Sequence, residues 1–307
     1  MDFKGANILS THQFDREDIK HVINTAMKFE QYANKKKSSQ MMKGKVLAAL
    51  FYEPSTRTRL STETAMKRLG GSVITAVGEE YSSLLKGETL YDTGKIVSNY
   101  ADIIAIRHSR EGSADEFARG ANVPVINCGD GPGQHPTQAL LDMYTIKKEL
   151  GKIDDVTIAM SGDLKFGRTV HSLVYLLLHF KVKLIFIAPK QLKMPEEFKI
   201  DLREKGIEFE ETTDFIKGIK AADVLYQTRV QRERFENPYE YEQLKDVYVL
   251  HKSIVEENNP DLIIMHPLPR VGEITEDVDE LKGAAYFREA GNGLAVRMAL
   301  LSLVLGL

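Results

Sequence analysis

A run of hydroxyl and guanidinium side chains stands out in residues 51–71, FYEPSTRTRLSTETAMKRLGG, because its residue types could bind an anion. Ser55, Thr56, Arg57 and Thr58 lie where a strand pattern gives way to a helix pattern. The start of a helix offers unpaired backbone N–H groups and a partial positive charge, to which hydroxyl donors and a forked guanidinium would add. Together these groups favour a phosphate-binding cradle.

The same residue types have a simpler interpretation. Ser and Thr are common helix N-caps, so Ser55 could do no more than cap the helix, with the arginines solvated or ion-paired. The stretch alone does not decide between the cradle and the cap.

Further polar residues recur at one place in the predicted fold, after strand-like runs. In open α/β sheets, ligands bind beyond the carboxyl ends of the strands, where loops meet helix starts. At such positions the sequence has Arg107 and His108, His135 to Gln138, Arg168, Arg229 and Gln231, and the run His266-Pro267-Leu268-Pro269-Arg270. Each alone could be a surface ion pair or a hydrogen-bonded turn residue. Gathered cations repel one another unless they bind anions, so we expect ligands with several negative charges.

The elements that must position these residues are short β-branched runs alternating with helical periodicity, which is typical of parallel α/β sheets. The strand-like runs are KVLAALFY, SVITAV, DIIAIRH, VPVIN, VTIAMSGD, KLIFIAP, DVLYQTRV and DLIIMHPLP. Helices are predicted at residues 55–69, 87–100, 113–120 and 136–150, from about Arg168 to Phe180, and from about Pro195.

A length of 307 residues suits two domains. We predict an α/β protein of two doubly wound parallel-sheet domains, residues 1–134 and 135–290, with the active site in the cleft between them. The C-terminal helix 291–307 is apolar almost all round, so we expect it to pack back on the first domain.

Composition excludes several classes of partner. The chain has 41 Lys and Arg against 44 Asp and Glu, a net charge of −3, so no broad basic field exists to attract nucleic acid or an anionic membrane. The single cysteine, Cys128, allows no internal disulfide and no Cys-rich metal site, which fits a reducing compartment and favours the cytoplasm. We expect no signal peptide, because the N-terminus lacks an apolar run of the length that a signal peptide needs, and no membrane span, because the longest apolar runs fall short of ~20 residues.

Common cofactor motifs are missing or incomplete. DTGKIVS resembles a fragment of a P-loop, but six residues rather than four separate Gly87 and Gly94, and Lys95 has no Ser or Thr directly after it. No G-x-G-x-x-G, H-E-x-x-H or nucleophile-elbow motif occurs. We therefore expect no nucleotide, hydride or metal cofactor.

Seven motifs over about residues 45 to 300 resemble those of the aspartate/ornithine carbamoyltransferase family: FYEPSTRTR, SSLLKGETLYDT, IRH, GDGPGQHPTQALLD, GDLKFGRTVHS, TRVQRERF and HPLPRVGEI. Lys-Gly-Glu-Thr and His-Pro-Leu-Pro-Arg point to the aspartate branch, the catalytic chains of aspartate carbamoyltransferases, because the ornithine enzymes carry His-Cys-Leu-Pro at the latter place. One departure is Pro54, where the family has a familiar alanine. Its fixed φ is harmless before a helix start.

The resemblance implies a reaction of carbamoyl phosphate with L-aspartate that gives N-carbamoyl-L-aspartate and phosphate, the committed step toward pyrimidines. Both substrates are dianions, which agrees with the gathered arginines. By position, the phosphate would be held by Ser55, Thr56, Arg57 and Thr58. The carbamoyl carbonyl would face Arg107, His135 and Thr58, and its amino group would face Gln138.

For the second substrate, the resemblance implies that Arg168 receives the α-carboxylate of aspartate, while Arg229 and Gln231 take the β-carboxylate. The backbone carbonyl of Leu268 would orient the attacking amine. The departing phosphate can accept the amine proton, so the protein has to align the substrates and stabilise charge, with Arg107 and His135 at the oxyanion.

The resemblance also implies partners. Ser82 and Lys86 belong in the family to a loop that reaches the neighbouring subunit's site, where Lys86 contacts aspartate, so we expect a cyclic homotrimer. Glu53 is expected to pair with Arg168 or Arg234 when the domains close. Some family members bind a separate regulatory chain, and a chain with one cysteine cannot itself hold the Cys-rich zinc site of such chains.

Two other functions stay open on the residues alone. A transferase that uses ornithine would need a carboxylate in place of Arg229 or Gln231, because its second substrate carries a cation. A non-catalytic anion sensor on the same fold would bind these ligands without releasing phosphate. A phosphate-release assay separates an enzyme from a sensor.

Overall fold

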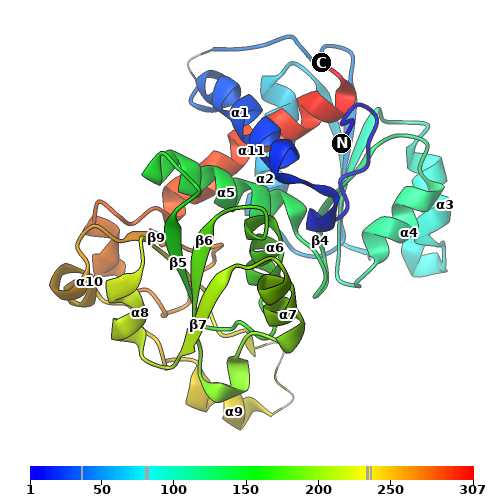
Figure 1. Cartoon of the computed structure of the whole chain (residues 1–307). Helices are drawn as coiled ribbons and strands as arrows, with labels where there is room; N and C mark the ends of the chain where they lie inside the picture. Colours follow the sequence, from blue (N-terminus) through cyan, green and yellow to red (C-terminus); the bar gives the residue numbers. More distant parts are fainter. Residues whose placement is uncertain (36, 80–82, 233–234, 236) are drawn as a thin grey trace. The chain divides into compact units, whose positions relative to one another are not determined.

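The computed structural model describes residues 1–35, 37–79, 83–232, 235 and 237–307 (Figure 1). It divides into two compact units: unit 1 comprises residues 1–144 and 291–307, and unit 2 comprises residues 145–290. Helices α5 (Pro136–Leu150) and α11 (Tyr286–Leu305) each run from one unit into the other. The boundary between residues 134 and 135 was expected just before α5, whereas the division falls inside that helix.

Unit 1 contains a four-stranded parallel sheet with the order β2-β1-β3-β4. Its strands are β1 (Val46–Phe51), β2 (Ser72–Val77), β3 (Ile103–His108) and β4 (Val125–Asp130). Its other helices are η1 (Thr11–Gln13), α1 (Arg16–Ala33), α2 (Arg57–Arg68), η3 (Ser83–Lys86), α3 (Leu90–Val97) and α4 (Ser113–Gly120).

The inner strands of unit 1 are apolar because both faces are covered. In β1, VLAALF, every residue after the first is buried, as the continuous apolar run predicts for a central parallel strand. Side chains of the inner strands pack with Phe117 of α4 into one core cluster. The helix predicted at 87–100 is shorter in the structure, since η3 precedes it and Thr89 caps α3 by accepting the Asp92 N–H.

Unit 2 contains a five-stranded parallel sheet with the order β7-β6-β5-β8-β9. Its strands are β5 (Val156–Ser161), β6 (Val182–Ile187), β7 (Glu208–Thr212), β8 (Val224–Gln227) and β9 (Ile263–Met265). Its other helices are α6 (Arg168–Leu177), η4 (Lys190–Leu192), α7 (Glu196–Glu204), α8 (Phe215–Ala221), α9 (Pro238–Leu244), α10 (Lys252–Asn258) and η6 (Glu276–Glu280).

The two parallel sheets confirm the predicted α/β class, with one strand that the sequence pattern missed. Strand β7 reads EFEET and lies at the sheet edge beside β6. Three of its five residues are Glu, which has low strand propensity, so the alternation of apolar and polar residues that marks a strand is weak here. Ion pairs hold its acidic side chains, for example Lys183 Nζ to Glu208 Oε1 at 2.6 Å.

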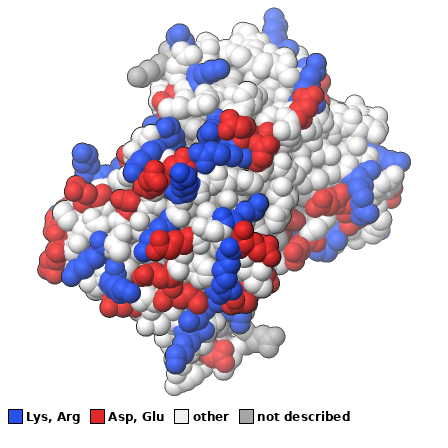
Figure 2. All heavy atoms as spheres, in the orientation of Figure 1, with Lys and Arg blue, Asp and Glu red and all other residues white. Residues whose placement is uncertain are grey.

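Parallel strands deliver the loops that follow them to one edge of their sheet. In unit 1 this edge carries the segments after β1, β3 and β4, and in unit 2 it carries the segments after β5, β8 and β9. On the face shown in Figure 2, described Lys and Arg side chains are mixed with Asp and Glu, in keeping with the small net charge. Among the described helices, none combines the length and the apolar character that crossing a bilayer requires.

Candidate active site

The segment after β1 starts helix α2 without a side-chain cap. Thr56 occupies the N-cap position with helical backbone angles (φ −83°, ψ −56°), and its side chain makes no capping hydrogen bond. The interpretation of Ser55 as a simple cap therefore does not describe this helix start. Ser55 and Thr56 stand at the end of α2 where the first helical N–H groups lack intrahelical partners, and Thr58 is buried.

Two guanidinium groups of unit 1 influence each other. Arg57 is exposed as a residue, but partial desolvation by the surrounding protein lowers its pKa. The charge of Arg107 lowers this pKa further. Arg107, in β3, has its Nε 3.2 Å from Glu53 Oε2 and donates from a terminal nitrogen to the Cys128 carbonyl at 3.4 Å. An anion bound beside both guanidinium groups would offset their repulsion. Glu53 is thus paired within unit 1, and the interdomain role expected for it stays a prediction.

The start of α5 contributes a second group of buried polar side chains. His135 is 4 % exposed and its Nδ1 lies 3.5 Å from the Thr137 hydroxyl. Gln138 donates from Nε2 to Asp142 Oδ1 at 2.9 Å, one turn further along the helix. That contact orients the Gln138 side-chain amide.

Arg297 of α11 is a buried cation that is not among the residues expected in the site. It is 4 % exposed, and it donates to the Thr137 hydroxyl at 3.3 Å and to the Gly293 carbonyl at 3.1 Å. Burial lowers its pKa to about 10, with Arg107 acting in the same direction. The signal was present in the sequence, because an arginine interrupts the apolar run LAVRMALLSLVLGL.

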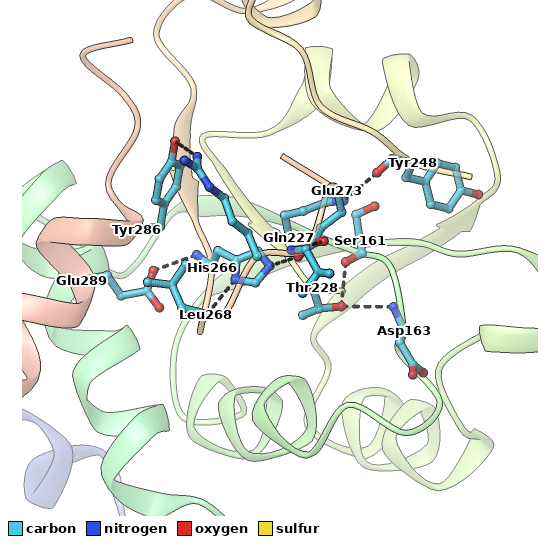
Figure 3. Close-up of polar contacts among 12 residues, drawn as sticks. Ser161, Asp163, Gln227, Thr228, Tyr248, His266, Leu268, Glu273, Tyr286 and Glu289 are labelled. Atoms are coloured by element: carbon cyan, nitrogen blue, oxygen red, sulfur yellow. Dashed lines mark hydrogen bonds and ion pairs between the residues drawn. The ribbon is translucent and has the colours of Figure 1, made fainter. Parts of the chain in front are cut away.

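In unit 2, the buried carboxylate of Asp163 ties two loops together. Its Oδ1 accepts the Phe166 N–H at 2.9 Å and its Oδ2 accepts the Gln231 N–H at 3.3 Å. Its own N–H donates to the Thr228 hydroxyl at 3.1 Å (Figure 3). Burial raises the pKa of Asp163, against the opposing effects of these backbone N–H groups and the charge of Arg229. The segments after β5 and β8 are thereby held side by side.

Three of the residues expected to bind aspartate lie on these two segments. Arg168 is the first residue of α6, and Arg229 follows β8; both are half-buried. Gln231 donates from Nε2 to the Phe166 carbonyl at 3.0 Å. Gly167 precedes Arg168 where a Cβ would come within 2.4 Å of the Asp163 carbonyl oxygen, so the tight approach to α6 requires glycine.

The segment after β9 forms a turn with an unusual backbone. Leu268 has φ +56°, in the left-handed region, and the peptide bond to Pro269 is cis. Buried polar groups surround the turn: His266 contacts Glu273, and Glu289 accepts the His266 N–H at 2.8 Å (Figure 3).

Three further predicted residues divide between described and undescribed parts of the chain. Lys86 is the last residue of η3 and is exposed. Ser82 and Arg234 lie outside the described residues. In the described ranges, no group of three or more His, Cys, Asp or Glu side chains is arranged to hold a metal ion.

Comparison with known families matches both units. Residues 6–148 match the carbamoyl-P binding domain of aspartate/ornithine carbamoyltransferases, and residues 154–304 match the Asp/Orn binding domain. The aspartate carbamoyltransferase catalytic subunit of Leptospira biflexa is 53% identical over 304 residues, covering 99% of this chain and 98% of the relative.

Solved structures give the same result. The catalytic subunit of M. jannaschii aspartate transcarbamoylase is 49% identical with a TM-score of 0.91, covering 97% of each chain. Aspartate transcarbamoylase from Trypanosoma cruzi, solved with carbamoyl aspartate and phosphate, is 39% identical with a TM-score of 0.92, covering 99% of this chain and 97% of that one. The same enzyme has been solved with carbamoyl phosphate and aspartate.

Proposed function

Because the chain belongs to the aspartate/ornithine carbamoyltransferase family, we propose that it transfers the carbamoyl group of carbamoyl phosphate to the amino group of L-aspartate. The products are N-carbamoyl-L-aspartate and phosphate, and the reaction belongs to pyrimidine biosynthesis. The observation that carries the choice of aspartate is Arg229 beside Gln231 after β8, since the cationic side chain of ornithine would need a carboxylate there. The nearby carboxylate of Asp163 is not placed as such a partner, because it is buried and accepts backbone N–H groups.

In this proposal, unit 1 binds carbamoyl phosphate. The N–H groups at the start of α2 and the side chains of Ser55, Thr56, Arg57 and Thr58 hold the phosphate. Arg107, His135 and Thr58 donate to the carbamoyl oxygen, and Gln138 contacts the carbamoyl amino group. The mutual repulsion of Arg57 and Arg107 supports an anion as their partner, because its charge would offset theirs.

Unit 2 binds aspartate. Arg168 receives the α-carboxylate, Arg229 and Gln231 receive the β-carboxylate, and the Leu268 carbonyl accepts from the amine. The hydrogen bonds of Asp163 support these roles, since they fix the Arg168 and Gln231 loops relative to each other. Lys86 reaches aspartate from a neighbouring subunit, and Ser82 accompanies it. Glu53, Arg168 and Arg234 act in domain closure.

Chemically, the amine nitrogen attacks the carbamoyl carbon, the bond from that carbon to the phosphate oxygen breaks, and the departing phosphate takes the amine proton. Negative charge develops on the carbamoyl oxygen as the nitrogen adds. Preorganised donors, here Arg107 and His135, stabilise such a charge more than they stabilise the ground-state carbonyl. Arg297 adds positive charge behind His135 through its contact with Thr137.

We further propose a cyclic homotrimer. Apolar side chains exposed on the edge strand β2 and on η3 support an interface there: Ile74 is 44 % exposed, Val77 42 % and Leu85 73 %. An edge strand with exposed apolar side chains is a common site of association.

The single buried cysteine, Cys128, is compatible with a cytoplasmic enzyme. A separate regulatory chain would be detected by native mass determination with cell extract.

The test is a product assay with two amino acids. Carbamoyl phosphate is incubated with the protein and either L-aspartate or L-ornithine, and the carbamoylated amino acid and phosphate are both quantified. We expect N-carbamoyl-L-aspartate and phosphate in equal amounts and no citrulline. Citrulline as the main product would establish the ornithine activity, and absence of phosphate release would favour an anion-binding protein.

A further inference from the structure

The polar groups behind the Leu268 turn form a chain of contacts with defined donors and acceptors (Figure 3). The Leu268 N–H donates to His266 Nδ1 at 2.7 Å, and His266 Nε2 lies 2.6 Å from Glu273 Oε1. The other Glu273 oxygen accepts the Val271 N–H at 2.9 Å. The side chains of His266 and Glu273 are 1% and 6% exposed, so these contacts are made away from solvent.

These contacts fix the tautomer of His266. A backbone N–H can only donate, so Nδ1 must accept with its lone pair, and the ring proton must lie on Nε2. Nε2 therefore donates to the Glu273 carboxylate. Burial alone would raise the pKa of Glu273, but the hydrogen bonds from His266 and the Val271 N–H outweigh it and lower the pKa. The carboxylate is thus charged and orients a neutral imidazole.

Leu268 needs such support because of its backbone. A leucine at φ +56° lies in the left-handed region, which is unfavourable for a residue with a Cβ and persists only where the surroundings hold it. The His266 ring holds the N–H of the residue, and the Leu268 side chain packs against the core of unit 2. No described residue donates a hydrogen bond to the Leu268 carbonyl oxygen.

We propose that His266 and Glu273 are positioning residues for the transfer reaction: Glu273 sets the tautomer of His266, and His266 holds Leu268 so that its carbonyl oxygen meets the amine of aspartate. This inference rests on the proposed function, which assigns that carbonyl to the amine. Neither side chain touches substrate in this account. Their effect is confined to the amine, whereas the carboxylates of aspartate are bound by other residues.

A pair of substitutions separates this role from simple packing. His266→Asn keeps an oxygen able to accept the Leu268 N–H, since Asn side chains accept from the N–H two residues on, but it loses the reach to Glu273. His266→Gln keeps a donor for Glu273 but loses the acceptor for Leu268. The inference predicts that activity and stability respond in opposite ways in these two variants.

The experiment measures kcat/KM for aspartate at saturating carbamoyl phosphate, the urea midpoint, and the inhibition constant of succinate. Succinate is aspartate without its amine, so it reports binding of the carboxylates alone. We expect His266→Gln to lower kcat/KM for aspartate about tenfold, the size of one lost hydrogen bond, with the succinate constant unchanged. His266→Asn should keep kcat/KM within about threefold of wild type while its urea midpoint falls.

Three results would overturn the inference: equal losses of kcat/KM in the two variants, a larger loss in His266→Asn, or parallel weakening of succinate and aspartate. If His266→Gln does not fold, a loss of activity in folded His266→Asn still contradicts it. The wild-type protein is assayed first for N-carbamoyl-L-aspartate. Failure there refutes the proposed function itself, and is thereby distinguished from failure of the positioning role.

Discussion

The two units use carboxylates in different ways near the residues that are proposed to bind anions. In unit 1, Glu53 forms an ion pair with Arg107, so its negative charge partly offsets the positive charge of the guanidinium group. In unit 2, Asp163 accepts hydrogen bonds from backbone N–H groups. Glu273 orients the His266 ring, which accepts the Leu268 N–H. Unit 1 thus places charges directly, whereas unit 2 shapes loops that carry the charges. Substitutions should accordingly affect the two substrates separately.

The largest effect is expected for Arg57→Ala. Loss of a charge-assisted, bidentate contact to phosphate costs ~1.5–3 kcal/mol or more, which corresponds to about a 10- to 150-fold fall in kcat/KM for carbamoyl phosphate. Steady-state kinetics with carbamoyl phosphate varied would measure it. The matched control is Lys67→Ala, which removes one exposed cation from the far end of the same helix and should change little. Equal losses in both variants would contradict a specific role for Arg57.

Arg229→Ala should act on the other substrate. We expect KM for aspartate to rise about tenfold, less than the effect of Arg57→Ala, because in the proposed site Gln231 also binds the β-carboxylate. The control is Lys220→Ala, an exposed cation on α8 of the same unit. If aspartate kinetics were unchanged in Arg229→Ala, the assignment of aspartate to unit 2 would be wrong.

Much of the fold could be predicted because its signals are local. Apolar runs predicted every strand except β7, whose sequence EFEET has no apolar run and which is seen as a strand in its pairing with β6. The C-terminal helix was expected from about residue 291 and begins at Tyr286. The extra turn includes Glu289, a buried residue whose carboxylate accepts the His266 N–H.

The site shows a similar limit. The segment Ser55 to Thr58 could be predicted as a candidate anion site because its residues are adjacent and stand at a helix start. Arg297 was missed because its contact with Thr137 joins residues far apart in sequence. Asp163 and Glu273 carry no local mark of their task, because the groups they hold are backbone N–H groups, which every sequence contains. Their roles become visible only in three dimensions.

Lys86 is proposed to serve the site of a neighbouring subunit, and mixed trimers can test this. Arg57→Ala chains and Lys86→Ala chains are each expected to have low activity. The two kinds of chain are dissociated, mixed and reassembled. In a cyclic trimer where each loop completes the adjacent site, about one quarter of all sites then combine an intact pocket with an intact loop. Activity should return to about a quarter of wild type. Verified hybrid trimers that stay inactive would mean that Lys86 does not serve a neighbour's site.

The smallest effect is expected on stability, from Glu273→Gln. The pKa of Glu273 is lowered in the folded chain, so its charge stabilises the fold above its unfolded pKa of about 4.3, and this contribution is lost as the pH falls through the folded pKa. Wild type should therefore exceed the variant by about 1 kcal/mol at pH 7 and by less near pH 4. Urea titration followed by circular dichroism at both pH values measures this. A difference that grows on acidification would contradict the assigned charge.

Cations of both units are proposed to serve one reaction, and titration with a bisubstrate ligand can test this proposal. A phosphonate joined to an aspartyl group is titrated by calorimetry into wild type, Arg57→Ala and Arg229→Ala. Wild type should bind it far more tightly than carbamoyl phosphate or succinate alone, because one ligand fills both anion sites while losing its translational freedom once. Each substitution should weaken this binding at least about tenfold. Unchanged affinity in either variant would contradict the account.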